Sequence, residues 1–96
     1  MKRRNEYSLK EVLEELLKAY RMEDKLEETR LINSWDKVVG GIFANHTQHL
    51  SIKNKILYVQ LDSAVLRSEL VMARSKLVEM LNKEAGKKII EDIVFR

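Results

Sequence analysis

The residue types that bind metals or transfer protons are few in this sequence, and their spacing favours no catalytic site. His46 and His49 are three residues apart, which would place both imidazoles on one metal ion if the segment were helical. The segment is expected to pass from a helix end into a strand, and no third ligand follows nearby. We therefore predict no metal site, with His46 capping a helix end and His49 on a strand edge.

Adjacent carboxylates occur at Glu27-Glu28 and at Glu91-Asp92. Acid–base catalysis by a carboxylate pair requires two groups in different environments that face one substrate. Neighbours on a helix point about 100° apart, and neighbours on a strand point to opposite faces, so neither pair meets this requirement. These residues are interpreted as solvated surface charge.

Two further observations exclude common enzyme and cofactor chemistries. The chain has no cysteine, which rules out thiol nucleophiles, thiolate zinc sites and iron–sulfur clusters. Gly40-Gly41 follows an expected helix rather than a strand and lacks the Lys-Ser/Thr pair of a nucleotide-binding loop. We predict a non-enzymatic protein that uses no cofactor and no small-molecule substrate.

Charge is distributed unevenly along the 96 residues. Residues 1–33 carry eight basic and eight acidic side chains, whereas residues 37–88 carry nine basic and four acidic ones, a net charge of +5. A basic half beside a neutral half favours a polyanionic partner, and a surface tuned for solubility explains the charge equally well. The candidate nucleic-acid-binding residues are Lys53, Lys55, Tyr58, Arg67, Arg74, Lys87 and Lys88.

Two of these candidates have a helical spacing. Arg67 and Arg74 are seven residues apart, so on a continuous helix they share one face with Val71 and Val78. Such a face is compatible with phosphate contacts, with a groove for a partner helix, or with arginine stems that only cover apolar surface. Val71 and Val78 are the candidate partner-binding residues.

Apolar periodicity predicts three helices. The capping box Ser8-Leu9-Lys10-Glu11 precedes a stripe of apolar residues with helical spacing, which predicts a helix over 9–22. A second helix is expected over 25–46, with a bend near its glycine pair because glycine weakens helices. A third, long helix is expected to begin near the N-cap candidate Ser63 and to end at Gly86.

Alternating apolar and polar residues predict three strands. Segments 50–53 and 56–61 are expected to form a β-hairpin around a turn at Asn54-Lys55, and the β-branched tail 89–95 is expected to form a third strand. Tyr58 points to the opposite sheet face from its apolar neighbours. There it either stacks on a base or packs against an adjacent strand.

The resulting order of elements is α-α-β-β-α-β. The long helix returns the chain so that the third strand runs parallel to the second, in a right-handed crossover. The fold class is therefore α+β, with a three-stranded mixed sheet and helices packed on one face. Trp35 is interpreted as a core anchor rather than a base-stacking residue, and the predicted core contains Trp35, Val39, Leu57, Val59, Leu70 and Leu77.

The chain is expected to form a single domain over residues 8–96, preceded by a flexible basic N-terminus at residues 1–7. No apolar run is long enough for a signal peptide or a membrane span, so a cytoplasmic location is expected.

A set of short motifs follows a recognisable order along the chain. Trp35-Asp36-Lys37-Val38-Val39-Gly40 fits the pattern W-x-x-(I/V)-V-G, and His46-Thr47 follows it. Leu57-Tyr58-Val59 fits an L-x-V strand, and further matches occur at Glu69-Leu70, Leu81-Asn82 and Asp92-Ile93. In order and spacing, from about Ser8 to Arg96, these motifs resemble the DciA family of bacterial replicative helicase loaders.

The resemblance implies a KH-like fold, binding to single- or double-stranded DNA, and action on the ring-shaped DnaB-type replicative helicase. The sequence is similar to the short form of the family, without the long disordered extension of many members, and the family has no catalytic residues to carry over. Two alternatives remain open. One is a protein-interaction module that binds no nucleic acid, and the other is an RNA-binding KH-like domain, although Gly40-Gly41 does not supply the G-x-x-G backbone clamp.

Overall fold

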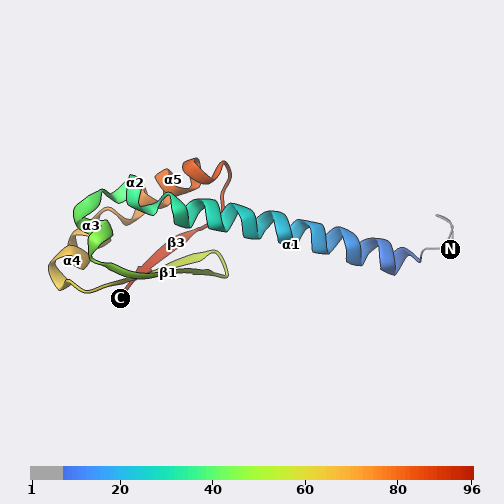
Figure 1. Ribbon diagram of the computed structural model, residues 1–96, viewed down its shortest axis with the longest axis horizontal. Helices are drawn as coiled ribbons and strands as arrows, with labels where there is room; N and C mark the ends of the chain where they lie inside the picture. Colours follow the sequence, from blue (N-terminus) through green and yellow to red (C-terminus); the bar gives the residue numbers. More distant parts are fainter. Residues whose placement is uncertain (1–7) are drawn as a thin grey trace.

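The computed structural model describes residues 8–96, so the predicted flexible N-terminus at residues 1–7 lies outside the described part of the chain. Its elements follow one another with short connections (Figure 1). In chain order they are α1 (Leu9–Asn33), α2 (Trp35–Val39), α3 (Gly41–Asn45), β1 (Thr47–Lys53), β2 (Ile56–Leu61), α4 (Ala64–Met72), α5 (Arg74–Ala85) and β3 (Asp92–Phe95).

The first helix is longer than its sequence pattern predicts. Its N-cap is as expected, because the Ser8 Oγ accepts a hydrogen bond from the Glu11 backbone N–H at 3.1 Å. The expected boundary near residues 23–24 is wrong, and α1 continues without a break to Asn33. The acidic residues there are good helix formers and no glycine or proline intervenes, so nothing in this stretch interrupts the backbone hydrogen bonds.

The bend expected near the glycine pair separates two short helices. Gly40 adopts φ 87° and ψ 166° between α2 and α3, a backbone conformation that side-chain-bearing residues rarely tolerate. Before this bend, Ser34 is the C-cap of α1, and its backbone N–H donates to the Arg30 carbonyl. The Ser34 hydroxyl donates to the Leu31 carbonyl at 2.7 Å. The chain thus turns twice between α1 and the sheet.

The sheet has the predicted topology. Its strand order is β1-β2-β3, with β1 and β2 antiparallel and β2 and β3 parallel. Asn54 and Lys55 form the hairpin turn with φ of 52° and 65°, the conformation of a type I′ turn. The third strand is shorter than predicted because Ile89 and Ile90 lie in the loop that precedes it, where Asn82 holds their backbone groups.

The expected third helix is divided in two. Ala73, with φ −100° and ψ 8°, separates α4 from α5, although alanine is the best helix former. No local residue type explains the break, and on either side of it Leu70 of α4 and Leu77 of α5 both enter the same core. The helix ends as predicted at Gly86, which adopts the left-handed conformation.

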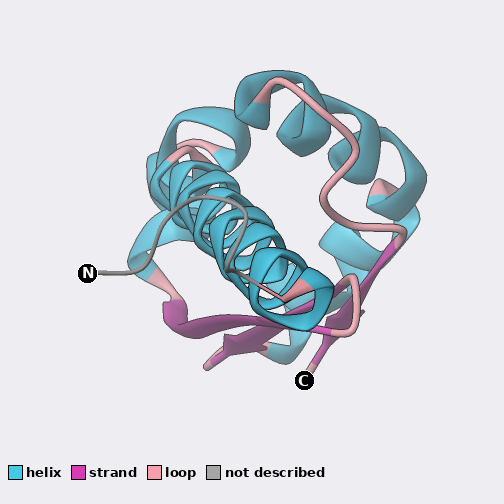
Figure 2. Cartoon of the chain, turned by 90° about the vertical axis from the view of Figure 1, so that its right-hand side faces the viewer, coloured by secondary structure: helices cyan, strands magenta, loops and turns pink. Residues whose placement is uncertain are grey.

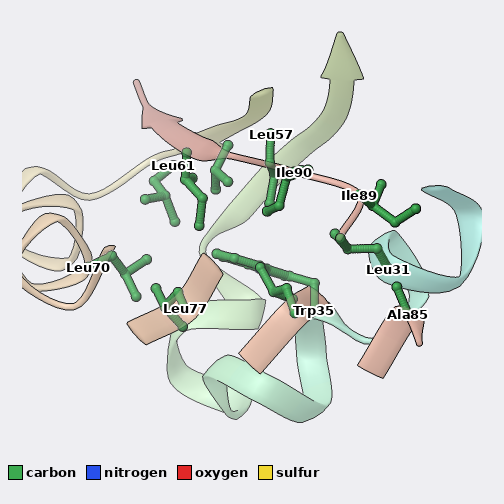
Figure 3. Packing of buried hydrophobic residues seen from close by; sticks show 12 residues of the cluster. Leu31, Trp35, Leu57, Leu61, Leu70, Leu77, Ala85, Ile89 and Ile90 are labelled. Carbon is green, nitrogen blue, oxygen red and sulfur yellow. The ribbon is translucent and has the colours of Figure 1, made fainter. Parts of the chain in front are cut away.

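The hydrophobic core lies between the sheet and the helices (Figure 3). Trp35, Leu57 and Val59 are buried, as are Leu70 and Leu77, while Val39 is half-buried and packs against this cluster. The indole Nε1 of Trp35 donates to the Thr47 hydroxyl at 3.0 Å, which satisfies the polar end of the ring. Trp35 is therefore enclosed and does not offer a face to a nucleic-acid base.

The helices cover one face of the sheet, and α1 extends far beyond it (Figures 1 and 2). The molecule measures 61 × 21 × 19 Å, and its radius of gyration is 17.9 Å, whereas a compact chain of this length has about 12–13 Å. The described residues thus form a compact body (residues 27–96) and a projecting helix half (residues 8–26). Among residues 8–96, no helix combines the length and apolar character needed to cross a membrane.

Candidate nucleic-acid interface

Three candidate lysines meet where the hairpin tip contacts the loop between α5 and β3. Lys55 lies in the hairpin turn, and its backbone carbonyl accepts a hydrogen bond from the Glu91 N–H at 2.7 Å. Lys87 and Lys88 belong to the facing loop and line a shallow pocket of about 220 Å³ together with Lys55. Lys53 is exposed at the end of β1, directly before the turn. We call Lys53, Lys55, Lys87 and Lys88 the lysine edge.

The loop that carries Lys87 and Lys88 is fixed at both ends. Gly86 adopts φ 89° and ends α5, which sends the chain back toward the sheet. After the lysines, the Asn82 Oδ1 accepts hydrogen bonds from the backbone N–H groups of Ile89 and Ile90 at 2.9 and 3.0 Å. Two backbone anchors therefore hold this half of the lysine edge in place relative to the hairpin.

The members of the lysine edge differ in their charge partners. Lys87 Nζ lies 3.1 Å from Asp24 Oδ1 of α1. This hydrogen bond is the main cause that raises the pKa of Lys87, against an opposing effect of desolvation, with further support from the charge of Asp24 itself. Lys53, Lys55 and Lys88 form no ion pair with any residue in the described range 8–96. Their charges are therefore available to an anionic ligand.

The two candidate arginines lie outside the lysine edge and on different helices. Arg67 is in α4, where its Nη2 donates to the Leu61 carbonyl at 3.3 Å and its buried Nε has no hydrogen-bond partner. Arg74 begins α5, and its Nε lies 3.3 Å from Asp92 Oδ1. The shared face that a continuous helix would give them is not formed, because the chain breaks at Ala73.

The same break separates the two candidate partner-binding valines. Val71 is 46% exposed on α4, beside Met72, which is 88% exposed. Val78 belongs to α5 and is half-buried against the hydrophobic core. Of the two candidate valines, therefore, only Val71 offers substantial apolar surface to a partner.

Tyr58 lies on the sheet face away from the core. It pairs across the sheet with Ser51 on one side and Val94 on the other, and it is half-buried. The guanidinium of Arg96 lies 4.9 Å from the centre of its ring, a cation–π contact. A base could stack on Tyr58 only by displacing Arg96 or by using the other side of the ring.

His46 links the end of α3 to the residue pair that precedes α4. It forms the C-cap of α3, and its Nδ1 lies 2.7 Å from Asp62 Oδ1, just before α4. Gln48 donates to the second oxygen of the same carboxylate at 2.8 Å, while His49 is exposed on β1. Within residues 8–96 there is no group of three histidine, aspartate or glutamate side chains placed to hold one metal ion.

These features define a class of protein: a small α+β domain of KH-like topology whose candidate site is a basic surface edge. The family model described as "Dna[CI] antecedent, DciA" matches residues 8–95. The chain belongs to the DciA family.

One curated relative also matches part of the chain. The chain is 28% identical over 61 residues to a "UPF0232 protein" of Corynebacterium glutamicum (strain R). The match covers 64% of this chain and 34% of the relative, so the chain spans about a third of the relative's length. No solved structure matches this chain.

Proposed function

We propose that this protein is a DNA-binding accessory factor of bacterial replication that acts on a DnaB-type replicative helicase in the cytoplasm. Membership of the DciA family supports a role related to helicase loading. The observation that supports DNA binding is the lysine edge, where Lys53, Lys55 and Lys88 carry no charge partner among residues 8–96. The proposed activity is binding and positioning, without covalent chemistry.

Phosphates are the part of DNA that such an edge recognises. Ammonium groups contact phosphate as point charges, and each neutralised phosphate releases condensed counterions, so affinity falls with salt. Four contacts predict a slope of log K against log salt of about −3 to −4, depending on whether the DNA is single- or double-stranded. Because phosphate contacts carry no sequence information directly, we expect weak dependence on sequence.

The test of DNA binding is an NMR titration of the full chain with a short single-stranded and a short duplex DNA at two salt concentrations. We expect salt-sensitive shifts at Lys53, Lys55, Lys87 and Lys88. Replacing Lys55 and Lys88 by Gln should weaken binding by about tenfold and lower the salt slope by about two. The matched control replaces Lys18 and Lys76, which are also exposed, and should leave binding unchanged. Equal losses in both variants would point to non-specific attraction, and no shifts at low salt would refute DNA binding.

Helicase action is tested separately with the purified helicase of the same organism. We expect the chain to co-elute with the helicase and to increase the amount loaded on single-stranded DNA. The Lys55→Gln, Lys88→Gln variant should still co-elute but load less helicase. Loading without any complex, or a complex that never affects loading, would contradict the proposed role.

One observation favours a second candidate function, a protein-interaction module. Val65, Val71 and Met72 are 69%, 46% and 88% exposed on α4, away from the lysine edge. A helicase complex lost on replacing Val71 and Met72 by Ser, with the fold intact and no DNA binding in any condition, would favour this function over the first.

A further inference from the structure

The projecting half of α1 carries an apolar stripe that no other part of the described chain covers. Every residue from Val12 to Leu26 is exposed. Six large apolar side chains lie on one face of the helix at exposures between 49% and 75%. They are Leu9, Val12, Leu13, Leu16, Leu17 and Tyr20, which we call the α1 stripe.

An exposed apolar stripe of this size is typical of an interaction surface. The six side chains together expose roughly 700 Å² of mainly apolar surface, which is above the range of the largest patch on a typical monomer. An isolated helix of about 15 residues is also only marginally stable in water, because tertiary packing normally supplies most helical stability. A surface that covers the stripe would therefore both remove apolar area from water and stabilise the projecting turns.

We propose that the occupant of the stripe is a second copy of this chain, packed antiparallel against the first. The stripe is complementary to itself in this orientation. When residue 13 of one helix faces residue 16 of the other, Leu9 faces Tyr20 and Val12 faces Leu17, so all six apolar positions meet apolar positions. This arrangement is a two-fold, isologous interface, the commonest kind in soluble oligomers.

Charge and shape favour the antiparallel orientation over the parallel one. On the same side of the helix, the stripe is followed by the acidic residues Glu23, Asp24 and Glu27. A parallel pair would place these carboxylates against their own copies and both compact bodies at the same end. The antiparallel pair sets the bodies at opposite ends and keeps the two acidic stretches apart.

The area is sufficient for a reversible dimer. Two stripes pressed together remove on the order of 1,200 Å² from water, the lower bound of standard specific interfaces. We therefore expect a dimer that dissociates in the micromolar range rather than an obligate one. It would present two lysine edges on one particle and so raise the apparent affinity for a DNA long enough to reach both.

The experiment is sedimentation equilibrium of the full chain without DNA or helicase, so its result is independent of the proposed function. We expect a monomer–dimer equilibrium in the micromolar range. Leu16→Glu should weaken association at least about tenfold, because the charge would be buried without a partner. Met22→Glu is the matched control: Met22 is 62% exposed on the same helix but on another face, and the change should leave association within about twofold.

Cross-linking tests the orientation. The chain has no cysteine, so an introduced thiol is unique. A mixture of Leu9→Cys and Tyr20→Cys chains should give a covalent dimer with a short thiol cross-linker, whereas neither variant alone should do so. Cross-linking of the Leu9→Cys variant with itself would overturn the antiparallel arrangement.

Two results would overturn the dimer itself. One is a monomer at every concentration up to the millimolar range. The other is a monomeric chain whose complex with the helicase is weakened by Leu16→Glu and not by Met22→Glu, which would assign the stripe to a different protein. Circular dichroism of each variant shows whether the body remains folded, and the body contains none of the substituted residues.

Discussion

The compact body and the projecting half of α1 carry the same kind of apolar pattern with opposite outcomes. In the body, Leu31 and Trp35 continue the helical stripe and are completely buried. About three to four turns before Leu31 on α1, Leu16, Leu17 and Tyr20 are more than half exposed. An apolar stripe with helical periodicity therefore predicts that one face of the helix is buried. It does not tell whether the burying surface belongs to the same chain.

The largest expected difference between the two regions is in stability. Trp35→Ala removes a fully buried ring and its hydrogen bond to Thr47, so it should lower the free energy of unfolding by about 3–5 kcal/mol. Leu13→Ala in the projecting half should cost less than about 1 kcal/mol, because the side chain has little packing to lose in the monomer. Both values come from urea denaturation at low protein concentration. A Trp35→Ala cost below about 1 kcal/mol would refute the assignment of the ring to the core.

A smaller effect is expected where the body positions the lysine edge. Asn82→Ala removes the side chain that accepts from the N–H groups of Ile89 and Ile90 and donates to the Ile90 carbonyl at 2.9 Å. We expect a loss of about 2–3 kcal/mol, because partly buried backbone groups lose their partners. Hydrogen exchange should show faster exchange at these two amides than in wild type.

The control for this change is Asn33→Ala, at the exposed end of α1. It should leave stability within about 0.5 kcal/mol of wild type. Unchanged exchange at Ile89 and Ile90 in the Asn82→Ala variant would mean that the loop holds its shape without Asn82. The lysine edge would then owe its geometry to Gly86 and the hairpin contact alone.

Much of the fold follows from the sequence because its local patterns agree with the tertiary structure. The hairpin, the parallel third strand, the Ser8 cap and the Gly86 terminus all rest on backbone chemistry that particular residues impose. The break at Ala73 and the short β3 do not follow from any local pattern in the sequence. No residue type near Ala73 marks the break.

The candidate site also has features that the sequence predicts and features that it does not. Parallel pairing of β2 and β3 sets Ile56 beside Asp92, so the expected topology already brings the hairpin tip close to the loop before β3. The placement of Arg67 and Arg74 on separate helices could not be predicted, because it depends on the break between α4 and α5. The ion pair of Lys87 with Asp24 also has no sequence signature, since 63 positions separate the two residues.

The smallest expected effect concerns that ion pair, which lies at the boundary between the two regions. Asp24 is 66% exposed and lies three residues before Glu27, the first half-buried residue that follows the exposed stretch of α1. Asp24→Asn should lower the pKa of Lys87 toward its ordinary value of 10.5, because it removes the main hydrogen bond that favours the charged amine. It should also speed amide exchange in the turn around residue 24. Glu15→Gln, in an exposed part of the projecting half, is the control and should do neither.

The sign of the pH dependence follows from the raised pKa of Lys87. A group with a higher pKa in the folded state stabilises the fold fully below its unfolded pKa, here 10.5, and the contribution disappears as pH rises through the folded value. The stability difference between wild type and Asp24→Asn should thus be constant at neutral pH and shrink above pH 10.5. It should also shrink with added salt, because Lys87 is exposed to solvent. A difference that persisted at high pH would mean that Asp24 acts on the helix itself and not through Lys87.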